Sequence, residues 1–371
     1  MGDAHLPGHL DNSGMKIIVP IGAAALLAAS TAAQAHVQLY GRLNVAIESV
    51  ATPHGELSRL SNNRSVLGFK GTEELGDSVK ALFQIEGTLA LDTGAGAPAQ
   101  RDTRLGIESG YGTLFAGHWV TAYNGATSSL DPFYPTSAGY MSIMGNGAAS
   151  STNNVQDTSS FDRRQANSVH GWTPRWHGLS LRATHGVNEE RPTSGARPSL
   201  LSLAALYEAG PWYAVLAQER HHDYQGPGLT DTGTKAALAY RFGGADGSLR
   251  LAAIVERLVY EIPAGRLARN AWYVSATWQT GRHSWRAGIA RARDGSGAAG
   301  AVGFVRTGPD TGAVHATLGY DYTLSPRSGV YLYHSRLRND ARGAYDFAIN
   351  PAGAGTGAHV EATAFGLRHA F

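Results

Sequence analysis

Cysteine is absent from this 371-residue chain, so neither a disulfide framework nor a thiolate metal site is available. Long apolar runs are also lacking, because no window after the amino-terminal region approaches 18 uninterrupted apolar residues. Helical membrane spans are therefore not expected. Lysine is rare, since four lysines among 31 basic residues leave 27 arginines, and the net charge is only +2. Without a block of basic residues, the chain has no sequence feature of a nucleic-acid partner.

The amino-terminal region has the order of a secretory signal peptide. A basic start at Lys16 is followed by a short apolar stretch over residues 17–29 and by the small-residue site Ala33-Gln34-Ala35. This apolar stretch is shorter than the roughly 20 residues of a spanning helix. We expect three parts: a mis-called, unstructured start over residues 1–14, a signal peptide over 15–35, and a single mature domain over 36–371.

Alternation of apolar and polar residues recurs along the mature chain. In segment 37–50, Leu39, Val45 and Ile47 fall on one face, and Gln38 and Arg42 fall on the other. Lengths of about 9 to 14 residues are close to the roughly 9–11 that a tilted membrane strand needs. The even number of segments suits a bacterial outer-membrane barrel. The sixteen segments are 37–50, 64–73, 78–91, 101–109, 112–120, 163–173, 178–188, 199–208, 211–222, 233–242, 247–259, 270–280, 283–293, 312–322, 328–339 and 358–371.

The connections between these segments alternate between short and long, which is typical of an outer-membrane barrel. Tight turns are expected at residues 73–77, 109–111 and 210–211, and longer loops at 51–63, 92–100, 189–198, 223–232, 260–269, 294–311 and 340–357. Residues 121–160 form a long connection without a convincing strand. A sixteen-stranded lumen is wide enough to hold water, so this loop would narrow it by folding inward. The sequence therefore predicts an all-β fold, a sixteen-stranded antiparallel transmembrane β-barrel.

Several motifs in order along the chain resemble one family. They include Leu39-Tyr40-Gly41, the Gly-Thr-Glu-Glu-Leu-Gly turn over residues 71–76, Asp131-Pro132-Phe133, and the terminal Gly-Leu-Arg-His-Ala-Phe over residues 366–371. On these residues the chain resembles the general porins of Gram-negative bacteria, in their β-proteobacterial branch. The resemblance implies a homotrimer in the outer membrane, in contact with lipid and lipopolysaccharide, with the third extracellular loop folded inward. It also implies that the assembly machinery recognises the terminal strand ending in Phe371.

Arginine should face the interior of such a barrel, because at the lipid-facing midplane it costs roughly 2–4 kcal/mol. Similar porins oppose a ladder of arginines on the wall to acids on the inserted loop. The candidates for the constriction are Arg42, Arg64, Arg101, Arg104 and Arg164 on the wall and Asp131 on the loop. Alignment with the family favours Arg101 over Arg104, whereas strict alternation turns Arg101 outward, and both stay open. Val66 also departs from the family, since many relatives carry arginine there.

Three functions are compatible with these features. The first is passive diffusion of ions and small hydrophilic solutes, with a mild anion preference from the excess of arginine. The second is a substrate-specific channel for an organic acid, phosphate or sugar, to which Tyr40, Tyr273, Tyr331 and Tyr333 would contribute. The third is a barrel hydrolase, because Ser168 and His170 share a strand face, although a nucleophile also needs an oriented third group. We expect the first function, with no enzymatic activity, no cofactor and no metal.

Overall fold

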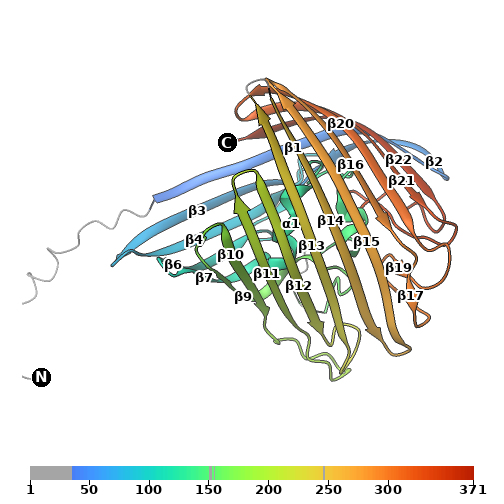
Figure 1. Ribbon diagram of the computed structural model, residues 1–371, viewed down its shortest axis with the longest axis horizontal. Coiled ribbons are helices and arrows are strands. Elements are labelled where there is room, and N and C mark those ends of the chain that lie inside the picture. The colour runs from blue at the N-terminus through green and yellow to red at the C-terminus, as the bar shows by residue number, and fades with distance from the viewer. Residues whose placement is uncertain (1–35, 150–152, 154, 245–246) are drawn as a thin grey trace, which may run out of the picture. The chain divides into compact units, whose positions relative to one another are not determined.

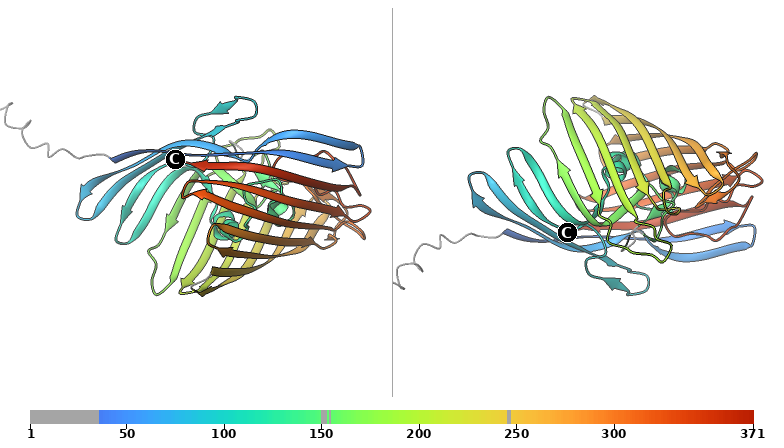
Figure 2. Two further views of the ribbon diagram at one scale, coloured as in Figure 1. Left: turned by 90° about the horizontal axis from the view of Figure 1, so that it is seen from above. Right: turned by 90° about the horizontal axis from the view of Figure 1, so that it is seen from below.

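The computed structural model describes residues 36–149, 153, 155–244 and 247–371. The expected signal peptide (15–35) and start (1–14) lie outside the described residues. The described chain forms an antiparallel β-barrel, with the short helix α1 drawn inside the wall (Figures 1 and 2). Among these residues no helix has both the length and the apolar character needed to cross a membrane.

Sixteen barrel strands are present in the described residues, as predicted, if the consecutive segments β2 and β3 are counted as one strand. They are β1 (His36–Thr52), β2 (Gly55–Asn62) with β3 (Ser65–Gly76), β4 (Val79–Leu89), β6 (Thr103–Ser109), β7 (Gly112–Val120), β9 (Asp162–Trp172), β10 (Leu179–Gly186), β11 (Ser199–Ala209), β12 (Trp212–His222), β13 (Thr230–Gly244), β14 (Gly247–Ile262), β15 (Gly265–Thr280), β16 (His283–Ala292), β20 (Ala313–Ser325), β21 (Ser328–Asn339) and β22 (His359–Ala370). The loops hold the short strands β5 (Gly96–Ala97), β8 (Ala148–Ala149), β17 (Ser296–Gly297), β18 (Ala301–Val302) and β19 (Val305–Arg306).

The barrel closes where the first strand pairs with the last. β1 and β22 are antiparallel in a register that runs from Arg42 opposite Ala370 to Ala51 opposite Glu361. At the end of this seam, Gly41 and Phe371 exchange backbone hydrogen bonds of 3.2 and 3.1 Å. The terminal strand is thus paired with the first, and its edge is not left exposed.

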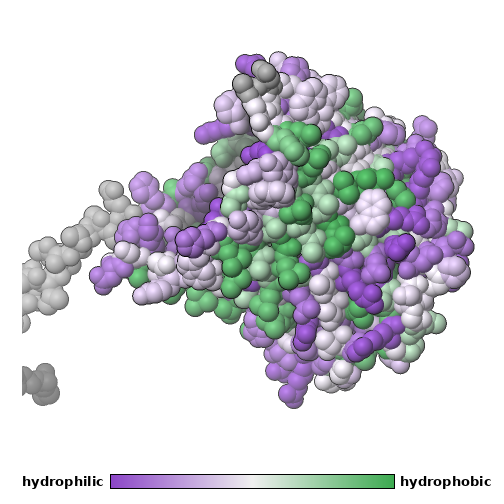
Figure 3. All heavy atoms as spheres, in the orientation of Figure 1, coloured by the Kyte–Doolittle hydropathy of each residue, from purple (hydrophilic) through white to green (hydrophobic). Residues whose placement is uncertain are grey.

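Alternation along the strands separates an apolar outer face from a more polar interior. Ile47, Leu105 and Leu318 point outward and remain 67%, 69% and 68% exposed. Their neighbours Ala46 and Thr317 point inward and are buried. Figure 3 shows apolar residues gathered over the middle of the barrel wall, as a membrane-facing surface requires.

The prediction of long loops is wrong at two places in the chain. Residues 51–63 and 260–269 are instead tight hairpins, because β1 and β2 are separated by two residues and β14 and β15 by Pro263 and Ala264. The outward side chains near the second hairpin include Glu261 and Arg266. These strands therefore lack the apolar alternation of a lipid-facing segment, which is the signal on which the strand boundaries were predicted.

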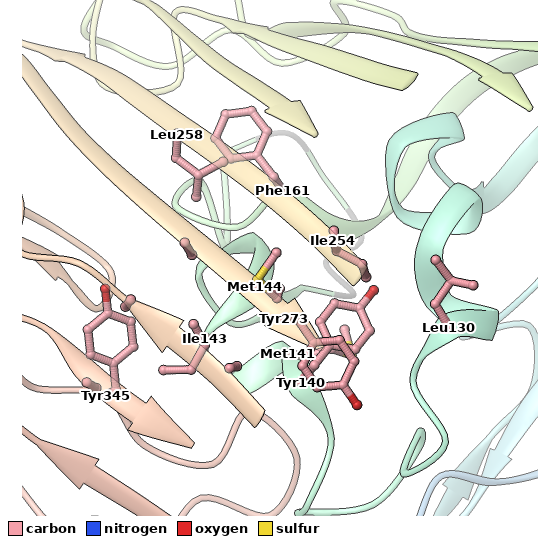
Figure 4. Packing of buried hydrophobic residues seen from close by; sticks show 14 of the residues in the cluster. Leu130, Tyr140, Met141, Ile143, Met144, Phe161, Ile254, Leu258, Tyr273 and Tyr345 are labelled. Carbon is pink, nitrogen blue, oxygen red and sulfur yellow. The ribbon is translucent and has the colours of Figure 1, made fainter. Parts of the chain in front are cut away.

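The connection between β7 and β9 packs against the inner face of the opposite wall. It contains α1 (Ala122–Thr127) and the 3₁₀ turns η1 (Ser128–Leu130), η2 (Tyr140–Ser142) and η3 (Met144–Asn146). Thr121 caps α1 by accepting a hydrogen bond from the Asn124 amide at 3.2 Å. In Figure 4, Tyr140 and Met144 of this loop lie beside Ile254 and Tyr273, which belong to β14 and β15. All four side chains are buried in one apolar cluster.

Candidate functional site

The loop between β7 and β9 is fixed to the barrel through its backbone. Inward-facing side chains from β10 to β20 donate to loop carbonyls or accept from loop amides, and side chains of the loop such as Asp131 and Ser137 add further bonds to the wall. The pairs are Thr184 Oγ1 with Ala122 N (3.0 Å), Ser202 Oγ with Tyr123 N (2.9 Å), Tyr213 OH with Ala126 O (2.6 Å), Arg250 Nη1 with Ser129 O (2.9 Å), Ser275 Oγ with Leu130 O (2.8 Å), Thr317 Oγ1 with Ala138 O (3.1 Å), Arg269 Nη1 with Ile143 O (2.8 Å) and Glu256 Oε1 with Gly145 N (2.9 Å).

Asp131 is one of these attachments rather than a free charge in the lumen. The residue is only 5% exposed. Its carboxylate accepts hydrogen bonds from the amides of Phe133 (3.0 Å) and Tyr140 (2.9 Å) and from the Tyr273 hydroxyl (3.1 Å). Burial raises the pKa of Asp131 to about 6, against the lowering effect of these bonds and of Arg286. The Asp131 carboxylate thus lies toward Tyr273 on β15 and Arg286 on β16, not toward the arginine wall.

Tyr134 is the loop residue that meets the arginine wall. Its hydroxyl accepts a hydrogen bond from Arg64 Nη1 at 3.3 Å, and Arg42 Nη2 donates to the Arg64 carbonyl at 3.0 Å. Burial alone would raise the pKa of the Tyr134 hydroxyl, but the guanidinium groups of Arg64, Arg101 and Arg164 together lower it to about 8. The structure therefore brings four of the five predicted arginines together, around a tyrosine that the sequence analysis did not name.

The acids opposite these arginines lie on the wall itself. Arg101 Nε is 2.9 Å from Glu86 Oε1, and Arg164 Nε is 2.7 Å from Asp102 Oδ1. The Tyr40 hydroxyl donates to the other Glu86 oxygen at 3.0 Å. Four guanidinium groups against two carboxylates leave an excess of two positive charges near the loop. The sequence analysis missed both acids, although alternation along β4 places Glu86 on the inner face with Leu82.

The outward orientation that alternation gives to Arg101 is wrong. Arg101 precedes β6, which begins at Thr103, so the period of two does not extend to it. Arg104 does belong to β6 and takes a different place. Its guanidinium carbon lies 4.3 Å from the ring centre of Trp119, within a group of aromatic rings. The Arg104 guanidinium therefore contacts aromatic rings rather than carboxylates, and it does not belong to the cluster around Tyr134.

The tyrosines considered for solute binding are engaged within the protein. The Tyr333 hydroxyl donates to Glu48 at 2.7 Å, and the Tyr331 hydroxyl donates to Asn44 Oδ1 at 2.7 Å. Tyr273 holds Asp131, as described above. Glu48 is itself an attachment of the loop, because it accepts from Ser137 Oγ at 3.4 Å. These hydroxyl groups therefore serve the internal hydrogen-bond network.

Ser168 and His170 lie within hydrogen-bond distance but lack the third group of a hydrolase. Ser168 Oγ is 2.8 Å from His170 Nε2, and the other ring nitrogen is 3.0 Å from Thr184 Oγ1, a hydroxyl rather than a carboxylate. Ser168 is only 3% exposed, and its hydroxyl also lies 2.9 Å from the Gly117 carbonyl. A nucleophile needs an oriented base and access to substrate, and this hydroxyl has neither an acid behind its histidine nor an open face. Among the described residues, no group of three or more His, Asp or Glu side chains could hold a metal ion.

Known proteins with similar sequences and folds are outer-membrane porins. The sequence profile of the Gram-negative porin family matches residues 22–342. Outer membrane porin protein 32 of Delftia acidovorans is 25% identical over 379 residues, which covers 94% of this chain and 98% of that protein. The anion-selective porin from Comamonas acidovorans superposes with a TM-score of 0.75 at 20% identity and covers 91% of this chain and 100% of its own. A trimer form of OmpT from Vibrio cholerae superposes with a TM-score of 0.64 at 14% identity over 91% of this chain and 99% of its own. Because the family profile matches most of its length, the chain belongs to the Gram-negative porin family.

Proposed function

We propose that the protein forms a water-filled channel in the Gram-negative outer membrane, through which ions and small hydrophilic solutes diffuse passively. The observation that carries this proposal is the meeting of Tyr134 on the loop with Arg42, Arg64, Arg101 and Arg164 on the wall. Charged and polar groups that face each other across a narrow water-filled passage determine which ions pass through it. The excess of positive charge there gives a mild preference for anions.

We infer the roles of the predicted site residues from the contacts that support them. Arg42, Arg64, Arg101 and Arg164 form the basic side of the constriction, and Glu86 and Asp102 moderate its charge. Asp131 is a positioning residue that holds the loop against β15. Arg104 lies beside the aromatic group and contributes to the basic lumen away from the narrowest part.

We further infer that the protein works as a homotrimer and has no enzymatic activity. The trimer form of one structural relative supports the first statement, and the buried Ser168 supports the second. Residues 15–35 are removed on export, and the strand ending in Phe371 is recognised during assembly. Lipid and lipopolysaccharide contact the exposed apolar face of the barrel.

Planar-bilayer recordings test the channel directly. Purified trimer should give stepwise conductance in potassium chloride, and a salt gradient should give a reversal potential of the sign expected for anion preference. Replacing Arg42 and Arg164 together by glutamine should move this potential toward cation preference, because the wall then has no excess positive charge. Absence of conductance from correctly folded trimer would contradict the channel, and an unchanged potential in the double variant would contradict the constriction.

A further inference from the structure

A second group of arginines lies on the opposite wall, in one row across neighbouring strands. Arg241 on β13 is paired with Arg250 on β14, Arg250 with Thr277 on β15, and Thr277 with Arg286 on β16. Adjacent strands lie about 4.8 Å apart, so Arg241 and Arg250 are immediate neighbours and Arg286 is about 10 Å further along the row. We refer to Arg241, Arg250 and Arg286 as the arginine row.

Pairing two arginines directly across a ladder is unfavourable, since like charges at opposed positions repel. A neighbouring acid usually offsets this repulsion, but none of the described residues lining the space in front of the row is acidic. Arg286 does pair with Asp321, which Arg368 also contacts at 2.7 Å, so this one carboxylate serves two arginines. The three arginines of the row therefore carry more positive charge than the neighbouring carboxylate offsets.

The row faces a cavity of about 320 Å³ beneath the loop. This size is at the lower end of the roughly 300–1,000 Å³ of small-molecule sites. Besides the three arginines, its lining consists of neutral hydrogen-bonding groups and a short apolar edge. These residues are Ser129, Leu130 and Pro132 of the loop, and Ser248, Ser275, Thr277 and Gln279 of the strands.

The cavity is held in shape by the loop attachments. Arg250 donates one Nη1 hydrogen bond to the Ser129 carbonyl at 2.9 Å, and Ser275 donates to the Leu130 carbonyl at 2.8 Å. Arg286 donates to the Pro132 carbonyl. A guanidinium carries five N–H donors, so these bonds orient Arg250 and Arg286 and still leave donors for a ligand. The site is thus pre-organised from two sides.

We propose that this cavity binds a small phosphorylated polyol on its way through the channel. Guanidinium groups bind phosphate oxygens in a planar, two-bond geometry, which the neighbouring Arg241 and Arg250 can supply together. The hydroxyl and amide groups of Ser248, Thr277 and Gln279 can both donate to and accept from the hydroxyls of a sugar. A simple dicarboxylate carries no hydroxyl donors, so it would leave the accepting capacity of these groups unused. The inference rests on the proposed channel function, because the cavity lies inside the barrel.

Inhibition of ion current by added solute tests this site. Trimer in a planar bilayer would be titrated with glucose 6-phosphate, glucose, inorganic phosphate and succinate. Glucose 6-phosphate should reduce the current at a concentration about tenfold lower than glucose and about threefold lower than phosphate or succinate. Only glucose 6-phosphate has both a phosphate for the arginines and hydroxyls for Ser248, Thr277 and Gln279. Arg241→Gln and Arg250→Gln should each raise its half-inhibiting concentration about fivefold.

Arg327→Gln is the matched control. It removes the same charge from an exposed turn between β20 and β21, outside the cavity, and should leave the inhibition unchanged. Arg250→Gln also removes the hydrogen bond to the Ser129 carbonyl of the loop. Arg241→Gln leaves that bond in place, so unchanged inhibition in Arg241→Gln would contradict the site.

The outcomes separate this site from the channel itself. Equal inhibition by glucose and glucose 6-phosphate in a conducting trimer would overturn the site and leave the channel function standing. Equal inhibition by succinate or inorganic phosphate would overturn the proposed ligand class. Only a folded trimer without conductance would contradict the channel function.

Discussion

Replacing Glu256 by glutamine should loosen the loop between β7 and β9 more than any exposed substitution of the same kind. Glu256 accepts hydrogen bonds from the Tyr123 hydroxyl at 2.9 Å and from the Gly145 amide at 2.9 Å, and it pairs with Arg269 Nη2 at 3.0 Å. Both members of this ion pair have fully buried side chains. The carboxylate therefore joins two parts of the loop to β14 and β15.

The size of the effect follows from this burial. Removing one partner of a buried ion pair costs about 3–5 kcal/mol, because the other charge stays buried without its counter-ion. We expect the lower end, about 3 kcal/mol, since Arg269 also donates to the Ile143 carbonyl at 2.8 Å. At 1.4 kcal/mol for each factor of ten, the population with a displaced loop should rise about 100-fold.

Two measurements follow the loop directly. Glu256→Gln should increase the frequency of brief current fluctuations in single-channel recordings and the rate of proteolytic cleavage within the loop. Glu361→Gln is the control, because its pair with Arg336 (2.6 Å) is about 40% exposed and is worth no more than about 1 kcal/mol. If both variants gave the fluctuations and cleavage rate of the unchanged protein, Glu256 would not hold the loop, and the energetic reasoning would be wrong.

The remaining predictions concern the arginine wall and the seam. Anion preference should fall as pH rises from 7 to 9, because the Tyr134 hydroxyl with its pKa of about 8 becomes a negative charge beside the arginines; Tyr134→Phe should abolish this change in reversal potential. Glu86→Gln removes a negative charge from the wall and should shift the reversal potential further toward anions, the opposite direction to loss of an arginine. Gly41→Val should impair folding into heat-resistant barrels, because a Cβ there would lie 2.3 Å from the Phe371 ring, whereas a Cβ at Gly171 in β9 meets no atom within 4 Å, so Gly171→Val tests the loss of a strand glycine alone. Normal assembly of Gly41→Val would contradict the close packing at the seam.

The strands and their faces could be predicted because their signal is local. The period of two along β1, β15 and β22 reflects contact with lipid on one side, and each strand carries that record in its own residues. At the β14–β15 hairpin the strands extend beyond the lipid, and the alternation of apolar and polar residues stops there. The ends of these two strands at the hairpin were therefore missed.

The arginine cluster around Tyr134 could be predicted only in part, because it depends on contacts across the barrel. Arg42 and Arg164 follow from alternation, but Arg101 lies before β6, where alternation gives no information. The partnership of Asp131 with Tyr273 joins residues of different strands, and neither neighbourhood in the sequence contains a sign of it. The same holds for Tyr134, whose importance comes from arginines on the facing wall.

The seam between β1 and β22 also has a consequence for the order of folding. Every other pair of barrel strands in the described chain joins strands that follow one another along the chain, the most distant across the loop between β7 and β9, whereas Gly41 and Phe371 are separated by 330 positions. Contacts between distant residues form late, because the intervening chain must first be ordered. Before this step the structure is an open sheet with two unpaired edges, which is prone to pair with other chains. We therefore expect pairing of β1 with β22 to limit the rate of barrel closure, so substitutions at the seam should change that rate more than substitutions of equal size elsewhere on the wall.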